Sequence, residues 1–338
     1  MLHIHNGESS ANTLQQSTIR GEQFAFRDAL IAGPTPGGLT SEDWGRVRAQ
    51  HLSDAYGIDS QECERDLLLQ EKTLASFPDH EEVVLWFEHD LFCQVNLIYL
   101  LDWFSQRHLG KTKLSLICIG EFPGKENFRG LGELDVDQLG SLFDLRHEVA
   151  PAELNLATAA WKAYCSPDPT AIEKRLGDDT SALPFLRNAL RGHLARFPSV
   201  KNGLGRIENC GLALIHSGLK EFDRLFPKFG DAEPVYGLGD FQFWLALKRL
   251  SDAREPLLTI TNGSRANQAL SSDKLLKTSF EMTAKAEAAL TGEADFVAMN
   301  GIDLWLGGVH LSEKDKLWRW DEHKQRLAHP NRLRYSRS

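Results

Sequence analysis

The segment Glu88-His89-Asp90 carries the residue types that acid–base chemistry needs, because it places an imidazole between two carboxylates. Neighbouring acids raise the pKa of a histidine and suit it for proton transfer. The segment follows the apolar run of residues 83–87, where the pattern predicts that a strand ends and a helix begins. In the alternative interpretation, Asp90 only caps that helix and His89 is solvated. We take His89 and Asp90 as candidate catalytic residues and Glu88 as a candidate ligand-binding residue.

A second pair of charged residues, Arg27-Asp28, follows the apolar run of residues 24–26. An aspartate at such a place can act as a nucleophile, a base or a magnesium ligand, and an arginine beside it can clamp an anion. Asp28 is therefore the third candidate catalytic residue, and Arg27 is a candidate ligand-binding residue.

A polar turn, Asn6-Gly7-Glu8-Ser9-Ser10, leads from a short apolar run into a helical segment. Backbone N–H groups and hydroxyl groups at a helix N-terminus can hold a phosphate or a carboxylate. The alternative is that Ser9 or Ser10 is simply the helix N-cap. The candidate ligand-binding residues of this turn are Asn6, Gly7, Ser9 and Ser10, and Glu121 after residues 114–119 completes the set.

Three further residues have a structural explanation beside a functional one. His3 and His5 share a strand face as a metal ligand pair would, but in a strand buried on both sides they are core residues with hydrogen-bond partners. Cys93 fits packing and a nucleophile equally well. The chain contains no GxGxxG, GxxxxGK[ST], GxSxG or HExxH motif, which disfavours the enzyme classes that these motifs mark. The sequence thus identifies no metal ligands and leaves the cofactor open.

The elements that must position these residues alternate in type. Four apolar runs predict strands, at residues 2–5, 24–26, 83–87 and 114–119, with helical segments between them. This β-α-β-α-β-α-β order predicts an α/β fold with a Rossmann-like parallel sheet, covered on both faces. Ligands of such sheets bind beyond the carboxyl ends of the strands. We therefore expect Asn6, Asp28, His89 and Asp90 to meet in one pocket at that edge.

The patterns divide the chain into four parts. Residues 1–150 are predicted to form the Rossmann-like domain, residues 151–230 a helical region, residues 231–328 a small α+β domain, and residues 329–338 a flexible tail. After the second strand we expect two inserted helices, near residues 41–55 and 60–76, with Ser41 and Ser60 as N-caps.

Aromatic residues near the C-terminus predict a β-hairpin. Two strands, near residues 304–311 and 317–320, would pair with each other. Trp305, Trp318 and Trp320 would then form a cross-strand cluster in that hairpin, not a platform for stacking bases.

Several of these motifs resemble one family. His3-Ile4-His5-Asn6-Gly7-Glu8-Ser9, Arg27-Asp28-Ala29-Leu30 and the stretch Leu85-Trp86-Phe87-Glu88-His89-Asp90-Leu91-Phe92-Cys93-Gln94 are similar to the N-terminal signature of a bacterial family catalogued as a domain of unknown function. The resemblance covers residues 1–150, and short motifs at residues 183–186, 202–204 and 307–311 resemble the C-terminal half of the same proteins. It implies the domain plan above and no particular reaction. Separately, residues 280–286 resemble the strand-to-helix step of winged-helix regulators.

The composition bounds the class of protein. With 338 residues, of which 42% are hydrophobic and 25% charged, the chain matches a globular protein of two or three domains. No stretch approaches the roughly 20 apolar residues that span a bilayer, and the first residues lack the features of a signal peptide. The 5 scattered cysteines contain no CxxC pair and fit reduced thiols. We therefore expect a cytoplasmic protein without a membrane partner.

Charge bears on the nature of the partner. A net charge of -9 disfavours nucleic acid. The exception is the acid-free segment of residues 187–206, whose basic residues are Arg187, Arg191, Arg196, Lys201 and Arg206. A solvated basic face is the simpler interpretation of this segment, and a phosphate-binding patch is the alternative.

Two classes of function follow from these observations. In the first, the protein is a small-molecule enzyme or ligand-binding protein that acts on a phosphorylated or nucleotide-like ligand. Ser9, Ser10 and Arg27 would then bind the anion, while Asp28, His89 and Asp90 would carry acid–base or metal-assisted chemistry. In the second, it is a ligand-sensing transcriptional regulator or an interaction scaffold with a winged-helix-like C-terminal domain.

Overall fold

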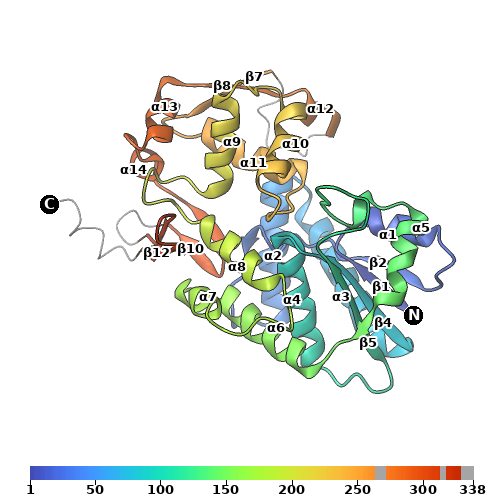
Figure 1. The fold of residues 1–338 in the computed structure, drawn as a ribbon. Coiled ribbons are helices and arrows are strands. Elements are labelled where there is room, and N and C mark those ends of the chain that lie inside the picture. The colour runs from blue at the N-terminus through green and yellow to red at the C-terminus, as the bar shows by residue number, and fades with distance from the viewer. Residues whose placement is uncertain (263–271, 313–316, 329–338) are drawn as a thin grey trace.

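A five-stranded sheet with strand order β2-β1-β4-β5-β6 forms the centre of the N-terminal half in the computed structural model, which describes residues 1–262, 272–312 and 317–328. The strands β1 (Leu2–His5), β2 (Glu22–Ala25), β4 (Glu82–Glu88) and β5 (Lys113–Ile119) are parallel. A short edge strand, β6 (His147–Glu148), runs antiparallel to β5. The predicted α/β fold with a parallel sheet is confirmed, and the antiparallel edge strand makes the sheet mixed (Figure 1).

Helices cover both faces of this sheet, as the alternating pattern predicts. Leu2, Ile4 and Leu85 face a core that includes residues of α4 (Leu91–Ser105) and α6 (Pro151–Tyr164). On the other face, Val84 and Trp86 pack against α1 (Glu8–Gln15) and α5 (Val136–Ser141). Because α4 is buried nearly all round, its first turn is held in a fixed position against the strand ends.

His3 and His5 are core residues with hydrogen-bond partners, as expected of a strand buried on both sides. The Trp86 indole donates to Nδ1 of His3 at 3.1 Å, and Nε2 of His3 lies 3.3 Å from the carbonyl oxygen of Arg20. Nδ1 of His5 lies 3.2 Å from the Ser10 hydroxyl, and its Nε2 lies 2.9 Å from Oε1 of Gln23. Neither ring offers a free nitrogen for a metal.

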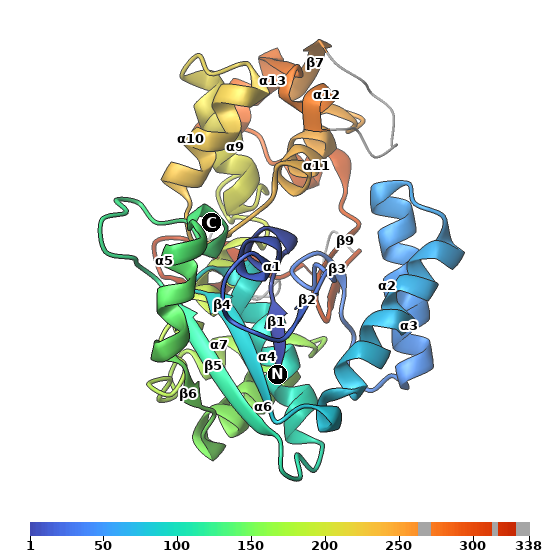
Figure 2. The same cartoon turned by 90° about the vertical axis from the view of Figure 1, so that its right-hand side faces the viewer.

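The two predicted inserted helices are present as α2 (Ser41–Tyr56) and α3 (Ser60–Ala75) (Figure 2). Their predicted N-caps, Ser41 and Ser60, are wrong by one residue. Thr40 accepts the N–H of Asp43, and Asp59 accepts the N–H groups of Gln61 and Glu62. In both places two residues with N-cap side chains are adjacent, and the first of them takes the extended backbone that a cap needs.

This assignment of the N-caps can be tested by comparing two alanine variants. Asp59→Ala should lower the free energy of unfolding by about 1 kcal/mol, because two N–H groups lose their acceptor. Ser60→Ala should change it by less than about 0.5 kcal/mol, since the Ser60 side chain caps nothing. Urea unfolding of both variants measures the difference, and the reverse order of effects would contradict the assignment.

The predicted helical region is confirmed. Its helices are α6, α7 (Thr170–Arg175), α8 (Leu186–Ala195), α9 (Arg206–His216) and α10 (Phe222–Ala232). The chain continues through α11 (Asp240–Ser251), β7 (Leu258–Asn262), α12 (Ser272–Leu276), β8 (Ser279–Met282), α13 (Ala284–Thr291) and α14 (Phe296–Asn300). β7 and β8 pair in antiparallel fashion. The predicted tail of residues 329–338 lies outside the described residues.

The predicted C-terminal hairpin is wrong in its pairing. The strand expected at residues 304–311 reverses at Gly307-Gly308 and forms a hairpin by itself, β9 (Leu304–Gly307) with β10 (Val309–Leu311). Gly307 has φ +63°, which suits a two-residue hairpin turn. β9 also pairs with β3 (Gly33–Pro34), while β11 (Arg319–Asp321) pairs with β12 (Arg326–Ala328).

The predicted tryptophan cluster is therefore not formed within one hairpin. Trp305 stacks on His310, with ring centroids 4.4 Å apart. Trp320 lies in β11 and donates to the carboxylate of Glu322 at 2.8 Å. Trp318 precedes β11 and lies outside both β9 and β10.

Candidate functional site

A cavity of about 370 Å³ lies at the carboxyl ends of β1 and β4, where the parallel sheet predicts a ligand site. Asn6 from the end of β1 lines it, together with Glu88, Asp90 and Cys93 from the end of β4 and the first turn of α4. The opposite wall comes from far along the chain and includes residues of α10 and the loop of residues 234–239. The site thus joins the sheet to the helical part above it in Figure 1.

The local sequence explains how the acidic side chains are held. Asp90 is the N-cap of α4, and its Oδ1 accepts the N–H of Cys93 at 2.8 Å. Glu88 is the last residue of β4, and its Oε1 accepts the N–H of Leu131 at 2.5 Å. Its Oε2 accepts a hydrogen bond from the Cys93 thiol. Both carboxylates are therefore fixed at the cavity wall.

Glycines let the backbone of other segments approach these carboxylates. Gly237 has φ +58°, and a Cβ built there would lie 2.2 Å from Cγ of Asp90. A Cβ at Gly130 would lie 2.8 Å from Oε1 of Glu88. Since any side chain at these positions would displace the acids, the two glycines shape the site.

No cation neutralises the two acids among the described residues. Neither Glu88 nor Asp90 forms an ion pair there, and Arg129, the arginine that lines the cavity, pairs with Asp231 instead. Burial raises the pKa of Glu88, and burial together with the neighbouring Glu88 raises the pKa of Asp90 to about 7. Burial and the two acids also raise the pKa of the Cys93 thiol. The site is therefore an acidic cluster in which the pKa values of both carboxyl groups and of the thiol are raised.

A chain of amides leads to the thiol. Nδ2 of Asn6 donates to Sγ of Cys93 at 2.8 Å, and Nδ2 of Asn96 donates to Oδ1 of Asn6 at 2.8 Å. Asn96 is fully buried, and its Oδ1 has no hydrogen-bond partner. Oε1 of Gln94 is also buried without a hydrogen-bond partner. Two buried polar atoms of α4 therefore find no partner among the described residues.

Asp28 lies away from this cavity. It forms a buried ion pair with Arg48 of α2, with Nη2 of Arg48 2.5 Å from Oδ1 and Nε 3.1 Å from Oδ2. Arg48 also donates to the carbonyl oxygens of Ala29, Ala32 and Pro34. Asp28 borders a second cavity, of about 740 Å³, between α2–α3 and α4–α6. With both oxygens held by a guanidinium group, Asp28 is placed to anchor α2 and not to meet Asp90.

The remaining candidates are also dispersed. The His89 ring packs against Phe185, 6.1 Å between centroids, and does not line the cavity. Arg27 is exposed and pairs with Glu8 at 2.6 Å. Ser9 donates to the carbonyl oxygen of Gly132, whereas Ser10 is buried against His5. Two more residues lie at the surface without a place in the cavity: Gly7, the N-cap of α1, and Glu121.

Sequence reasoning left Cys93 open between packing and a nucleophile, and it missed Asn96, Gly130 and Gly237. Cys93 and Asn96 follow Asp90 at helical spacing, three and six residues on, so the helix that Asp90 begins places all three near one another. That spacing was a usable signal. Gly130 and Gly237 come from loops without any such pattern, and only the folded chain brings them to Glu88 and Asp90.

Comparisons with known proteins give no assignment for this site: no family model matches the chain, and no curated protein matches it. None of the helices within the described residues has the length and apolar character needed to cross a membrane. The geometry of the cavity therefore carries the functional conclusion.

Proposed function

We propose that the protein is a small-molecule enzyme whose site is the cavity at the ends of β1 and β4. The observation that carries this proposal is a pair of acids on a cavity wall, the buried Asp90 and the half-buried Glu88, without a cationic partner among the described residues. Groups with strongly shifted pKa values in a cleft are typical of active sites. An acid whose pKa lies near 7 can give up or accept a proton at neutral pH, so Asp90 would serve as the proton-transfer group.

The ligand class follows from charge. The expected anion-binding residues, Ser9, Ser10 and Arg27, lie outside the cavity, so they do not support direct phosphate binding. Two carboxylates favour a ligand that presents hydrogen-bond donors or positive charge to them. We propose a phosphorylated or nucleotide-like ligand. Its phosphate would have to bind either Arg129, which lines the cavity, or a cation held by Glu88 and Asp90.

Two cavity-filling variants test this location. Gly230 in α10 lines the proposed site, and Gly45 in α2 lines the second cavity. A Cβ at either residue has room, since at Gly230 it would lie 3.5 Å from Nη1 of Arg129 and at Gly45 it would have no neighbouring atom within 4 Å. Leucine at each position should therefore fill one cavity and leave the other open.

The measurement is a thermal-shift screen of phosphorylated and unphosphorylated metabolites, carried out with a chelator present. We expect ligands that raise the melting temperature of the wild type to lose this effect in Gly230→Leu and to keep it in Gly45→Leu. The opposite pattern would move the site to the second cavity, and stabilisation that survives in both variants would also overturn the proposal.

A transcriptional regulator remains the second candidate because of one observation. The order α9, an isolated bridge between Glu221 and Ser279, α10, α11, β7 and β8 is that of a winged helix. In such domains the helix at the position of α11 reads DNA. Here no residue of α11 is exposed, and its two cations, Lys248 and Arg249, pair with Asp252 and Glu208.

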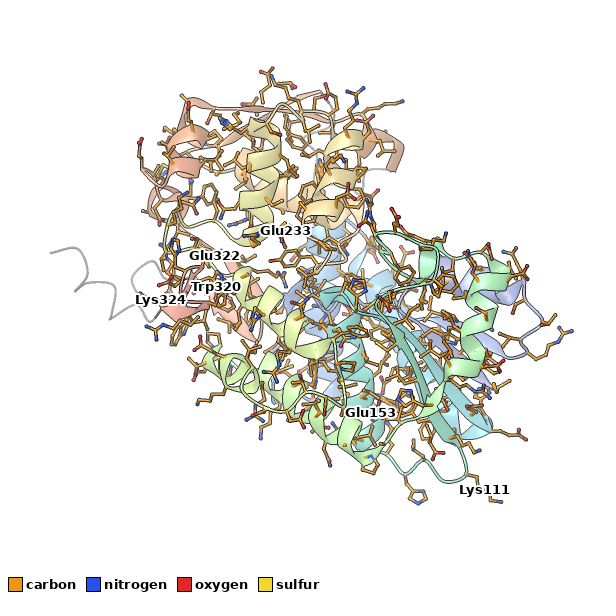
Figure 3. The ribbon with its side chains drawn as sticks, viewed as in Figure 1. Lys111, Glu153, Glu233, Trp320, Glu322 and Lys324 are labelled. Carbon is orange, nitrogen blue, oxygen red and sulfur yellow. The ribbon has the colours of Figure 1, made fainter. Side chains whose placement is uncertain are left out.

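The basic segment of residues 187–206 gives the regulator little support. Arg187 donates to two backbone carbonyl oxygens, and Lys201 donates to that of Leu290 at 2.7 Å. Arg206 pairs with Glu233 at 2.5 Å and with Glu322 at 3.5 Å, and both acids are labelled in Figure 3. We expect no salt-dependent binding to random duplex DNA tighter than about 10⁻⁴ to 10⁻⁶ M in a gel-shift titration. Tighter, salt-sensitive binding would favour the regulator.

Membership in the bacterial family and a cytoplasmic location also stand as proposals. The described thiols support the location, since Cys63, Cys93, Cys118, Cys165 and Cys210 are all free.

A further inference from the structure

We propose that Glu88, Asp90 and Cys93 bind one divalent transition-metal cation of the Zn²⁺ type. One ligand atom from each of these residues lies within 4.8 Å of the others. The inference deepens the proposed function, because it names a cofactor for the same cavity. The sequence alone identified no metal ligands, since these three residues become a cluster only where β4 passes into α4.

The unpaired charge of the two carboxylates is the first reason to expect a cation. Asp90 is 4% exposed, and only its Oδ1 has a hydrogen-bond donor. Buried carboxylates in proteins are paired with cations, coordinate metals or stay protonated. With no cationic side chain on either acid among the described residues, a bound cation is the partner that would let both carboxylates ionise.

The second step is the arrangement around the sulfur. Asn6 directs an N–H at Sγ of Cys93, and Asn96 fixes the orientation of the Asn6 amide. A neutral thiol is a weak acceptor, whereas a metal-bound thiolate gains from an N–H donor of this kind. Asn96 itself is fully buried, reaches the sulfur only through Asn6 and keeps an unpartnered Oδ1.

The donor set selects the kind of cation. A thiolate with two carboxylates suits Zn²⁺ and related transition metals, whereas Mg²⁺ prefers oxygen ligands alone. Three protein ligands beside a cavity leave the fourth position open, as in catalytic zinc sites. On binding, the cation accepts electron pairs from sulfur and oxygen, and the Cys93 S–H proton passes to the solvent, so no oxidation or reduction takes place.

The consequence for the substrate is a change in sign of the local charge. A bound divalent cation would turn the acidic wall into a site for an anionic oxygen, such as a phosphate or carboxylate group of the ligand. This would reconcile the proposed phosphorylated ligand with a cavity whose lining includes four acids, Glu88, Asp90, Glu133 and Glu233.

The test uses the full chain after removal of metals with a chelator. Titration with Zn²⁺ alone, followed by calorimetry, should show one site per chain. Titration with Co²⁺ should produce the near-ultraviolet absorption of a thiolate-to-cobalt bond. Cys93→Ser should abolish that absorption and weaken Zn²⁺ binding by at least about 100-fold. Even the loss of a residue that only hydrogen-bonds to a metal ligand weakens metal binding by about 10- to 100-fold.

Matched variants control for unrelated effects. Cys210→Ser on α9 and Asp102→Asn near the C-terminal end of α4 remove a thiol and a buried acid that lie outside the cluster, and both should bind Zn²⁺ as the wild type does. Asp90→Asn keeps an N-cap side chain, so it tests the ligand without removing the cap. It should weaken Zn²⁺ binding as strongly as Cys93→Ser.

Three results would overturn the metal site: no stoichiometric Zn²⁺ binding by the wild type, unchanged binding in Cys93→Ser and Asp90→Asn, or Mg²⁺ binding as tight as that of Zn²⁺. The metabolite screen above is therefore run with a chelator and again with added Zn²⁺. A ligand whose effect Gly230→Leu removes under both conditions supports the small-molecule site even if the metal site fails, whereas a ligand that acts only with Zn²⁺ supports both.

Discussion

Replacing Asp28 by asparagine should lower the free energy of unfolding by about 3–5 kcal/mol, because it leaves the buried charge of Arg48 without its partner. Arg48 has no exposed surface and makes six hydrogen bonds through Nε, Nη1 and Nη2 with Asp28 and with the carbonyl oxygens that follow it. The loss should be visible as a shift of the urea unfolding midpoint.

The matched control for this variant is Glu42→Gln, which breaks an ion pair with Arg46 on the surface of the same helix. Exposed pairs contribute about 0–1 kcal/mol, so this variant should unfold almost as the wild type does. If Asp28→Asn were as stable as Glu42→Gln, the anchoring role would be contradicted and a catalytic role for Asp28 would be open again.

The second large effect is a loss of folding stability at low pH, caused by the buried side chain of His5. Burial lowers the pKa of His5 to about 4, whereas an unfolded histidine titrates near 6.5. As the pH falls below about 6.5, the unfolded chain therefore takes up a proton that the folded chain refuses. His5 should cost on the order of 3 kcal/mol of stability by the time the pH reaches about 4, with no such cost above pH 7.

The measurement compares the pH dependence of unfolding in the wild type and in His5→Gln between pH 7 and pH 5. The variant should lose less stability over this range, because glutamine does not titrate. The comparison is needed because the raised pKa values of Glu88 and Asp90 act in the opposite sense and stabilise the protonated folded state as the pH falls. His310→Gln, at an exposed residue, is the control, and an equal slope in wild type and His5→Gln would refute the burial effect.

Much of the fold could be predicted because it depends on strong local patterns. The strand β4 is a run of apolar residues with polar ends, and α4 begins at an aspartate with a cap side chain. The hairpin at Gly307 also had a local signal, a Gly-Gly pair between two apolar runs, but the prediction treated residues 304–311 as one strand. The pairing of β3 with β9 has no local signal at all, because it joins segments far apart in the chain.

The cavity lies at the edge of the sheet where the sequence predicts a ligand site, but only some of the candidate residues line it. The preference of ligands for the carboxyl ends of parallel strands points to Glu88 and Asp90, but it does not say in which direction a side chain points. Of three consecutive residues, the outer two line the cavity while His89 packs against Phe185. Asp28 does not line the cavity for another reason, because it forms a buried ion pair with Arg48 of the inserted helix α2.

The parallel pairing of β3 with β9 has a consequence for the order of assembly. During synthesis, β3 leaves the ribosome well before β9, since all the elements from α2 to α14 lie between them. Contacts of such long sequence separation form slowly, because a large loop must close first. The pairing of β3 can therefore form only after β9 has emerged, and until then the segment that leads into α2 lacks this partner.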